Sequence, residues 1–178
     1  MITLEEAKDH LRVEGDFEDA LILSLIQAAY KHAENKTRRT LIDREETLIL
    51  DRLPIRGMGI ELPFNPVQEI LAFDYIDPDG NPESIDLLTL RLDKRTLYPM
   101  LMPQFGTEWP QVIGEPESIT IRLRIGYEET PADIRQALLL LISHFYEHRE
   151  AVVAGVSVTT LPMGVDMLLG SYQIQRVA

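Results

Sequence analysis

The sequence contains no cysteine. This absence excludes disulfide scaffolds, zinc sites built on thiolates, iron–sulfur clusters and thiol nucleophiles. No stretch approaches the roughly 20 consecutive apolar residues that a membrane span needs. The acidic start of the chain, Met1 to Glu6, is not typical of a secretory signal. We therefore expect neither a membrane protein nor a disulfide-rich secreted domain.

Positive charge is also scarce. The chain has 17 Lys and Arg residues against 29 Asp and Glu residues, which gives a formal net charge of −12. A chain this acidic repels phosphate backbones, so non-specific binding of nucleic acid is not expected. In other respects the composition is that of a globular protein, with 178 residues of which 45% are hydrophobic. Such a chain buries enough surface to fold without a metal or disulfide.

Capping signals and hydrophobic spacing predict two helices at the start of the chain. Thr3 and Glu6 form a capping box ahead of a short helix over about residues 4–12. Asp16 is expected to cap a longer helix that ends near the basic residues before residue 40. The long helix is apolar on more than one side. It should therefore pack on a core and on a neighbouring subunit.

The end of the chain also shows helical signals. Thr130 is expected to cap a helix, Pro131 to take its first position, and the pattern to continue to about residue 150. A last short helix is predicted over 165–169. Between these helices, the uncharged segment 151–161 reads as a mobile loop or as a strand that awaits a partner.

The middle of the chain is rich in proline, which excludes long helices there. Alternating apolar residues predict short antiparallel strands in this region instead. The predicted class is α+β: helices from both ends packed as a bundle (1–46 and 128–178), with a small antiparallel sheet or sandwich inserted between them (47–127). The strands are expected at residues 47–50, 59–62, 67–76, 85–92 and 118–125.

None of the candidate chemical motifs points to catalysis. His144 and His148 have a spacing that suits a metal, but Glu147 is misplaced for a metalloprotease and no third ligand is evident. The aspartates around Asp77 predict a hairpin turn, because the closing glutamate of a calcium loop is missing. No serine lies in a nucleophile elbow. We therefore predict no catalytic residue, no metal and no cofactor.

Two alternative functions remain open, one for the β region and one for the whole chain. Trp109 and Tyr98 could form a binding platform for a carbohydrate, although a lone tryptophan is more often a buried anchor of a loop. A packaging accessory that touches DNA directly is the other alternative, and the acidic charge argues against it.

The order of motifs along the chain resembles phage head–tail connector proteins, the adaptor or head-completion proteins of tailed phages and prophages. The resemblance begins with the opening residues 1–13 and the long helix after Asp16. It continues through Gly126, Tyr127 and Pro131 to the stretch His144–Glu150 and the closing residues 161–169. It covers nearly the whole chain.

This resemblance implies a structural virion protein and not an enzyme. It implies a ring, usually a dodecamer, that docks below the portal protein after DNA packaging. Such a ring extends the DNA channel without binding the genome specifically, and it offers a surface to the next head-completion or tail protein. Localisation would be the head–tail junction of the virion, after assembly in the cytoplasm of the host bacterium.

Closing a ring requires that one patch on a subunit meets a different patch on its neighbour. We expect the long N-terminal helix and the end of the third helix to supply these patches, and the segment 151–161 to become ordered on assembly. The candidate interface residues are Leu21, Leu25, Tyr146, Arg149, Val156 and Val158.

Overall fold

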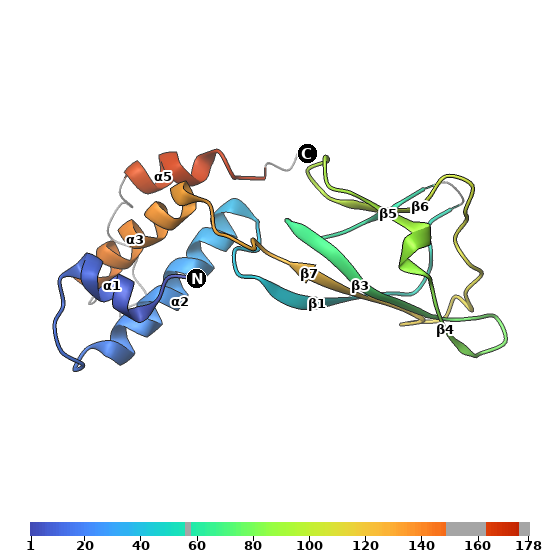
Figure 1. Cartoon of the computed structure of the whole chain (residues 1–178), viewed down its shortest axis with the longest axis horizontal. Coiled ribbons are helices and arrows are strands. Elements are labelled where there is room, and N and C mark those ends of the chain that lie inside the picture. The colour runs from blue at the N-terminus through green and yellow to red at the C-terminus, as the bar shows by residue number, and fades with distance from the viewer. Residues whose placement is uncertain (56–57, 149–162, 175–178) are drawn as a thin grey trace. The chain divides into compact units, whose positions relative to one another are not determined.

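The computed structural model describes residues 1–55, 58–148 and 163–174 (Figure 1). The chain divides into two compact units, a helical unit (1–41 and 129–178) and a β unit (42–128). Helices and antiparallel sheets are both present, so the predicted α+β class is confirmed. The first strand begins at Arg44, so residue 46, where the sequence placed the boundary, lies inside a strand.

The N-terminal helices begin at different kinds of cap. The hydroxyl of Thr3 accepts a hydrogen bond from the Glu6 N–H at 3.2 Å, as the capping box predicts. The prediction that Asp16 caps the long helix is wrong, because Glu18 takes the cap position and makes no side-chain cap bond. Asp16 lies in the preceding turn, where its carbonyl accepts from the Asp19 N–H at 3.2 Å. These helices are α1 (Leu4–Leu11) and α2 (Asp19–Thr37).

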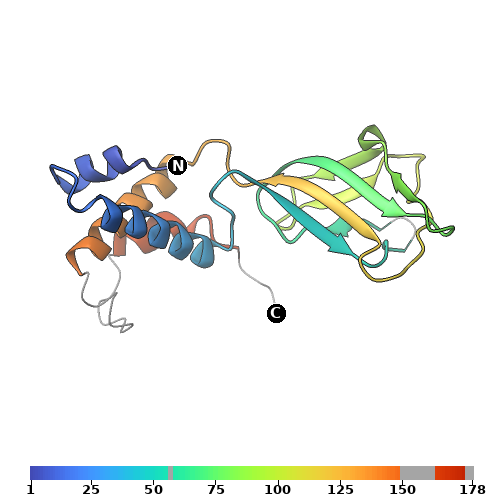
Figure 2. The same ribbon diagram turned by 90° about the horizontal axis from the view of Figure 1, so that it is seen from below.

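The C-terminal helices complete the helical unit. Pro131 occupies the cap position of α3 and not its first helical position, and α3 ends at Glu147, three residues before the predicted end. Figures 1 and 2 show α2 lying along α3, and α5 packs against both. The two helices are α3 (Ala132–Glu147) and α5 (Met163–Gly170). The buried core of this unit includes Ile22, Ile26, Ala29, Ile134, Leu138, Leu141, Val165 and Leu169.

Two antiparallel sheets form the β unit. One has the strand order β1-β7-β3-β4 and the other the order β2-β6-β5. The alternation predicted for the last strand is confirmed, because its four isoleucine and leucine side chains are buried while its arginines are exposed. The strands are β1 (Arg44–Leu50), β2 (Ile60–Glu61), β3 (Val67–Ile76), β4 (Pro82–Ser84), β5 (Leu90–Asp93), β6 (Met100–Pro103) and β7 (Ile119–Ile125).

The single strand predicted over residues 85–92 is wrong. A 3-10 helix, η1 (Leu87–Thr89), interrupts this stretch, and only its end belongs to β5. The carboxylate of Asp86 accepts the Leu88 N–H at 2.9 Å and so caps the helical turn. Side chains from both sheets then meet in one core around Phe73, Leu101 and Leu123.

The chain enters and leaves the β unit at neighbouring points. Ile42 and Tyr127 form an isolated parallel bridge. Gly126 has φ +94°, and a Cβ atom at this position would lie 2.2 Å from the carbonyl oxygen of Ile42. Only glycine allows the two segments to approach so closely.

Candidate assembly surfaces

The structure places the predicted interface residues in different environments. Leu25 is only 4% exposed and belongs to the core of the helical unit, so it is not available at the surface of the single chain. Leu21 is half-buried on the same helix. Tyr146 is also half-buried, and its hydroxyl donates to the carboxylate of Glu18. The remaining candidates, Arg149, Val156 and Val158, and the segment 151–161 lie outside the described residues.

The exposed side of α2 is formed by other residues. Leu23 is 46% exposed, and Gln27 and Lys31 are exposed further along the helix. The sequence predicted a broad apolar surface on this helix because leucine and isoleucine occur on several of its faces. The residues of the predicted apolar face, Leu25 among them, are mostly buried in the core of the chain itself, whereas Leu23 is exposed.

Large apolar side chains are exposed in both units. Phe17 is fully exposed in the turn before α2, and Met163 and Met167 are exposed on α5. In the β unit, Leu88 on η1 and Phe105 in the loop after β6 are exposed. Hydrogen bonds from Gln104 to the carbonyls of Leu88 and Thr89, each at 2.8 Å, hold that loop against η1.

Three histidines of the helical unit lie on α2, on α3 and directly after α3. His144 and His148 have ring centroids 4.6 Å apart. His32 on α2 stands edge-on to the ring of Phe145, and its Nε2 atom is buried without a hydrogen-bond partner. Among the described residues, no group of three or more His, Cys, Asp or Glu side chains could hold a metal ion.

Burial lowers the pKa of His32, and the nearby Lys36 lowers it further. Burial also lowers the pKa of His144, with a smaller effect from His148. Both groups therefore resist protonation in the folded chain, whereas in the unfolded chain they take up protons near their ordinary pKa of 6.5. Because the unfolded state binds more protons there, the helical unit should lose stability as pH falls below about 6.5.

Replacing His32 with leucine should reduce this acid sensitivity. The substitution removes a buried nitrogen that has no partner, so we expect little or no loss of stability at pH 7.5. The difference in melting temperature between pH 7.5 and pH 5.5 should become smaller than in the parent protein. His10→Leu, at an exposed position on α1, is the matched control and should leave that difference unchanged. An unchanged difference in the His32 variant would contradict the assignment.

Trp109 is an anchor of its loop. Its ring packs against Phe73 with centroids 5.8 Å apart, and its indole N–H donates to the carbonyl of Met58 at 2.9 Å. Two cavities border it, but Tyr98, the partner expected for a carbohydrate platform, lines neither of them. Because the indole N–H is already bonded within the chain, the arrangement favours the structural role of Trp109.

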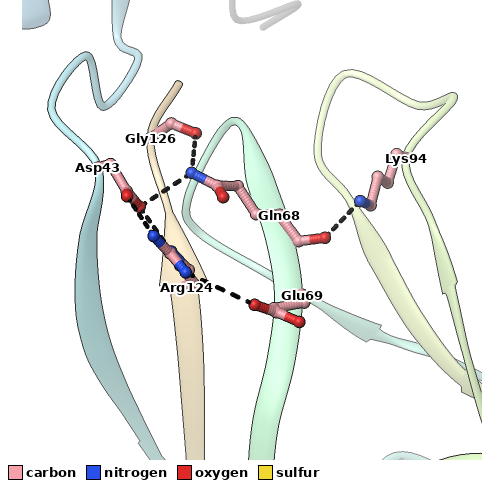
Figure 3. A network of polar contacts seen from close by, with 6 residues as sticks. All are labelled: Asp43, Gln68, Glu69, Lys94, Arg124 and Gly126. Atoms are coloured by element: carbon pink, nitrogen blue, oxygen red, sulfur yellow. Dashed lines mark hydrogen bonds and ion pairs between the residues drawn. The ribbon is translucent and has the colours of Figure 1, made fainter. Parts of the chain in front are cut away.

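The outward side of the four-stranded sheet carries a polar network at one end (Figure 3). The guanidinium of Arg124 contacts both carboxylate oxygens of Asp43, at 2.6 and 2.9 Å, and lies 4.0 Å from Glu69. The hydrogen bonds from Arg124 hold the pKa of Asp43 below its ordinary value. The side-chain amide of Gln68 bonds to Asp43 and to the Gly126 carbonyl. This network joins the segment just before β1 to β3 and β7, where the chain enters the unit.

Next to this network, on the same side of the sheet, lies a second surface, which we call the outer sheet face. It consists of Thr47 and Ile49 on β1, Ala72 and Asp74 on β3, and Thr120 and Arg122 on β7. Thr47 and Ala72 are the cross-strand neighbours of Arg122, and Ile49 and Asp74 are those of Thr120. Its residues come from three strands that are far apart in sequence, so only the pairing of the strands reveals it.

The first part of the chain, residues 1–72, contains α1, α2, β1, β2 and the beginning of β3. Residues 1–72 match the phage gp6-like head-tail connector protein family. The resemblance to connectors is therefore confirmed over these residues. No curated protein matches the chain, and no described helix is long and apolar enough to cross a membrane.

Chains in solved structures of a phage-like particle are similar to nearly the whole of this chain. A chain in the neck of an empty gene transfer agent (GTA) particle, computed with C6 symmetry, is 26% identical, with a TM-score of 0.77 and coverage of 99% of this chain and 91% of that chain. A chain in the virion of the native GTA particle gives 26% identity, the same coverage and a TM-score of 0.78. A chain in the native GTA neck, computed with C12 symmetry, gives 26% identity, a TM-score of 0.74 and coverage of 98% and 90%.

Proposed function

We propose that this chain is a structural, non-catalytic protein of the head–tail junction of a phage-like particle. It assembles into a ring, most simply a dodecamer, that sits below the portal protein and joins head to tail. The observation that carries the proposal is the match of 99% of the chain, at 26% identity, to a chain in a GTA neck. The family match over residues 1–72 supports the same role.

The electrostatics of the chain suit a channel through which DNA passes. With a net charge of −12 on each copy, a ring presents an acidic wall to the genome. Such a wall repels the phosphates, so DNA slides through the channel and does not adhere to it. A gel shift at low salt should therefore show no binding of double-stranded DNA by the isolated protein.

The helical unit supplies part of the contact between copies in this proposal. The exposed side of α2, including Leu23, and the end of α3 near Tyr146 are the surfaces that we assign to it. Leu25 is not part of this surface, because it is already buried within its own chain. The neighbouring partners of the ring are the portal protein on one side and the next head-completion or tail protein on the other.

Mass measurement tests the proposal directly. The purified protein is examined by mass photometry over a range of concentrations, alone and after co-expression with the portal protein from the same genome. Negative-stain microscopy then images each large species. We expect closed rings, alone or seated on the portal. A protein that stays monomeric in both preparations and does not co-purify with the portal would contradict the proposed function.

A further inference from the structure

Phe17 is a large apolar side chain that the chain leaves in full contact with water. It belongs to the turn between α1 and α2, which forms one end of the helical unit (Figures 1 and 2). Its side chain is fully exposed, so burial within its own chain does not account for a phenylalanine at this position. Aromatic side chains are enriched at the centres of protein interfaces, where a few of them carry most of the binding energy.

The turn that carries Phe17 is tied to helices on both sides. The Lys8 ammonium of α1 forms an ion pair with Asp19, the first residue of α2, at 2.6 Å. The hydroxyl of Tyr146, at the end of α3, donates to the carboxylate of Glu18. The backbone that presents the phenyl ring is therefore in place before any docking, which lowers the entropy cost of using the ring as an anchor.

The exposed side of α2 carries no exposed carboxylate, and we call it the α2 stripe. Helical spacing places its members on one side of the helix, over about 22 Å at 1.5 Å per residue. Lys31 and Arg38 give it two positive charges, and within the described residues neither side chain forms an ion pair. The stripe consists of Leu23, Ser24, Gln27, Lys31, Asn35 and Arg38.

The carboxylates next to the stripe are engaged within the chain. Glu34 lies on the same side of α2, but it is half-buried and its carboxylate accepts the Leu41 N–H at 2.8 Å. Asp166 of α5, which also packs on α2, forms an ion pair with Lys36 at 2.6 Å. The exposed charges of the stripe itself are therefore positive, in a chain whose net charge is −12.

The end of the unit that carries Phe17 has the opposite charge. Among residues 1–17, Arg12 is the only exposed lysine or arginine, and four exposed carboxylates outnumber it. These carboxylates are Glu5 and Asp9 on α1, and Glu14 and Asp16 in the turn.

We propose that Phe17 of one copy docks on the α2 stripe of the neighbouring copy, against Leu23 and Gln27, with Lys31 opposite the carboxylates that flank Phe17. This inference rests on the ring-forming function proposed above and names the partner of the α2 surface assigned there. A ring needs two different patches on each subunit, and these two have opposite charges. Both lie within residues 1–72, the stretch that matches the connector family.

Truncation of the anchor tests the contact. Phe17→Ala should raise the protein concentration needed for ring assembly by about tenfold or more, because a central aromatic side chain often carries much of the binding energy. Phe105→Ala is the matched control. It removes an equally exposed phenyl ring from the β unit, outside residues 1–72, so the assembly concentration should not rise. Circular dichroism checks that both variants are folded.

Charge reversal on the stripe tests the electrostatic part. Lys31→Glu places a carboxylate opposite carboxylates, so it should raise the assembly concentration at least about fivefold. The double substitution Glu14→Lys and Asp16→Lys, added in the same chain, should restore assembly because the opposite charges then face each other again. Arg52→Glu changes the net charge as Lys31→Glu does, but at an exposed position of the β unit, and should leave assembly unchanged.

Cross-linking identifies the partner surface without removing the anchor. Because the chain has no cysteine, Glu14→Cys and Gln27→Cys each introduce a single thiol, one beside Phe17 and one on the α2 stripe. Rings assembled from a mixture of the two variants and treated with a short bismaleimide should yield covalent dimers. A mixture in which Gln136→Cys, at an exposed position on α3, replaces Gln27→Cys should not.

The outcomes separate this inference from the proposed function. Parent rings together with unchanged assembly of Phe17→Ala, or an equal rise for Phe105→Ala, would overturn the docking of Phe17 and leave the proposed function standing. Cross-linking of Glu14→Cys to Gln136→Cys but not to Gln27→Cys would overturn the α2 stripe as the partner. Absence of any parent ring, alone or with the portal, would overturn the proposed function and this contact with it.

Discussion

Replacing Phe73 with alanine is expected to destabilise the β unit by about 3–5 kcal/mol, the usual cost of removing a buried aromatic side chain. Phe73 is 1% exposed, belongs to the core shared by the two sheets and packs against Trp109. Trp109 is the only tryptophan. Urea unfolding followed by its fluorescence therefore reports on this unit and measures the loss directly.

Phe105→Ala is the control for this substitution. Phe105 is a fully exposed phenylalanine of the same unit, so its removal should change the free energy of unfolding by less than about 0.5 kcal/mol. A loss below about 1 kcal/mol for Phe73→Ala would mean that the site collapses around the missing ring, and that Phe73 is not central to the core.

Replacing Gly126 with alanine is expected to cost about 3 kcal/mol or more. The position has φ +94°, and a sparsely populated backbone conformation alone costs about 1–3 kcal/mol for other residues. The added Cβ would also lie 2.2 Å from the carbonyl oxygen of Ile42 and 2.9 Å from the Asp43 nitrogen. Both neighbours are backbone atoms, so relief requires that the segments before β1 and after β7 move apart. Chemical denaturation measures the cost.

Gly114→Ala separates the free-energy cost of the steric clash from the cost of the positive φ. Gly114 also has a positive φ, of +76°, but no atom lies within 4 Å of a Cβ placed there. Its substitution should therefore cost only the conformational part, about 1 kcal/mol. Equal losses for the two variants would show that the close approach of Ile42 contributes nothing.

The sequence predicts those parts of the fold that depend on local patterns. The capping box at Thr3 and the alternation in β7 were enough to place α1 and one central strand. Strand β6 was not predicted, because the stretch Met100–Pro103 has neither alternation nor charge. The break between β4 and β5 is a 3-10 turn that local hydrogen bonds around Asp86 hold, and no periodicity reveals such a turn.

The candidate surfaces were harder to predict for a physical reason. Periodicity placed Leu25 on the apolar face of α2, but it could not show that α1, α3 and α5 of the same chain pack on this helix and leave Leu25 buried within the chain. Arg122 was expected to face outward, and the strand register sets its neighbours. The register pairs it with Thr47 and Ala72 and gives the acidic partners to Arg124.

The insertion of the β unit between the two parts of the helical unit affects the order of folding on the ribosome. Residues 42–128 emerge as one continuous stretch, whereas α1 and α2 are made first and must wait for α3 and α5. Domains generally fold as units during synthesis. The β unit should therefore complete its core while the N-terminal helices still expose the apolar side that α3 later covers. A pause in translation after residue 128 would prolong this exposure of the N-terminal helices.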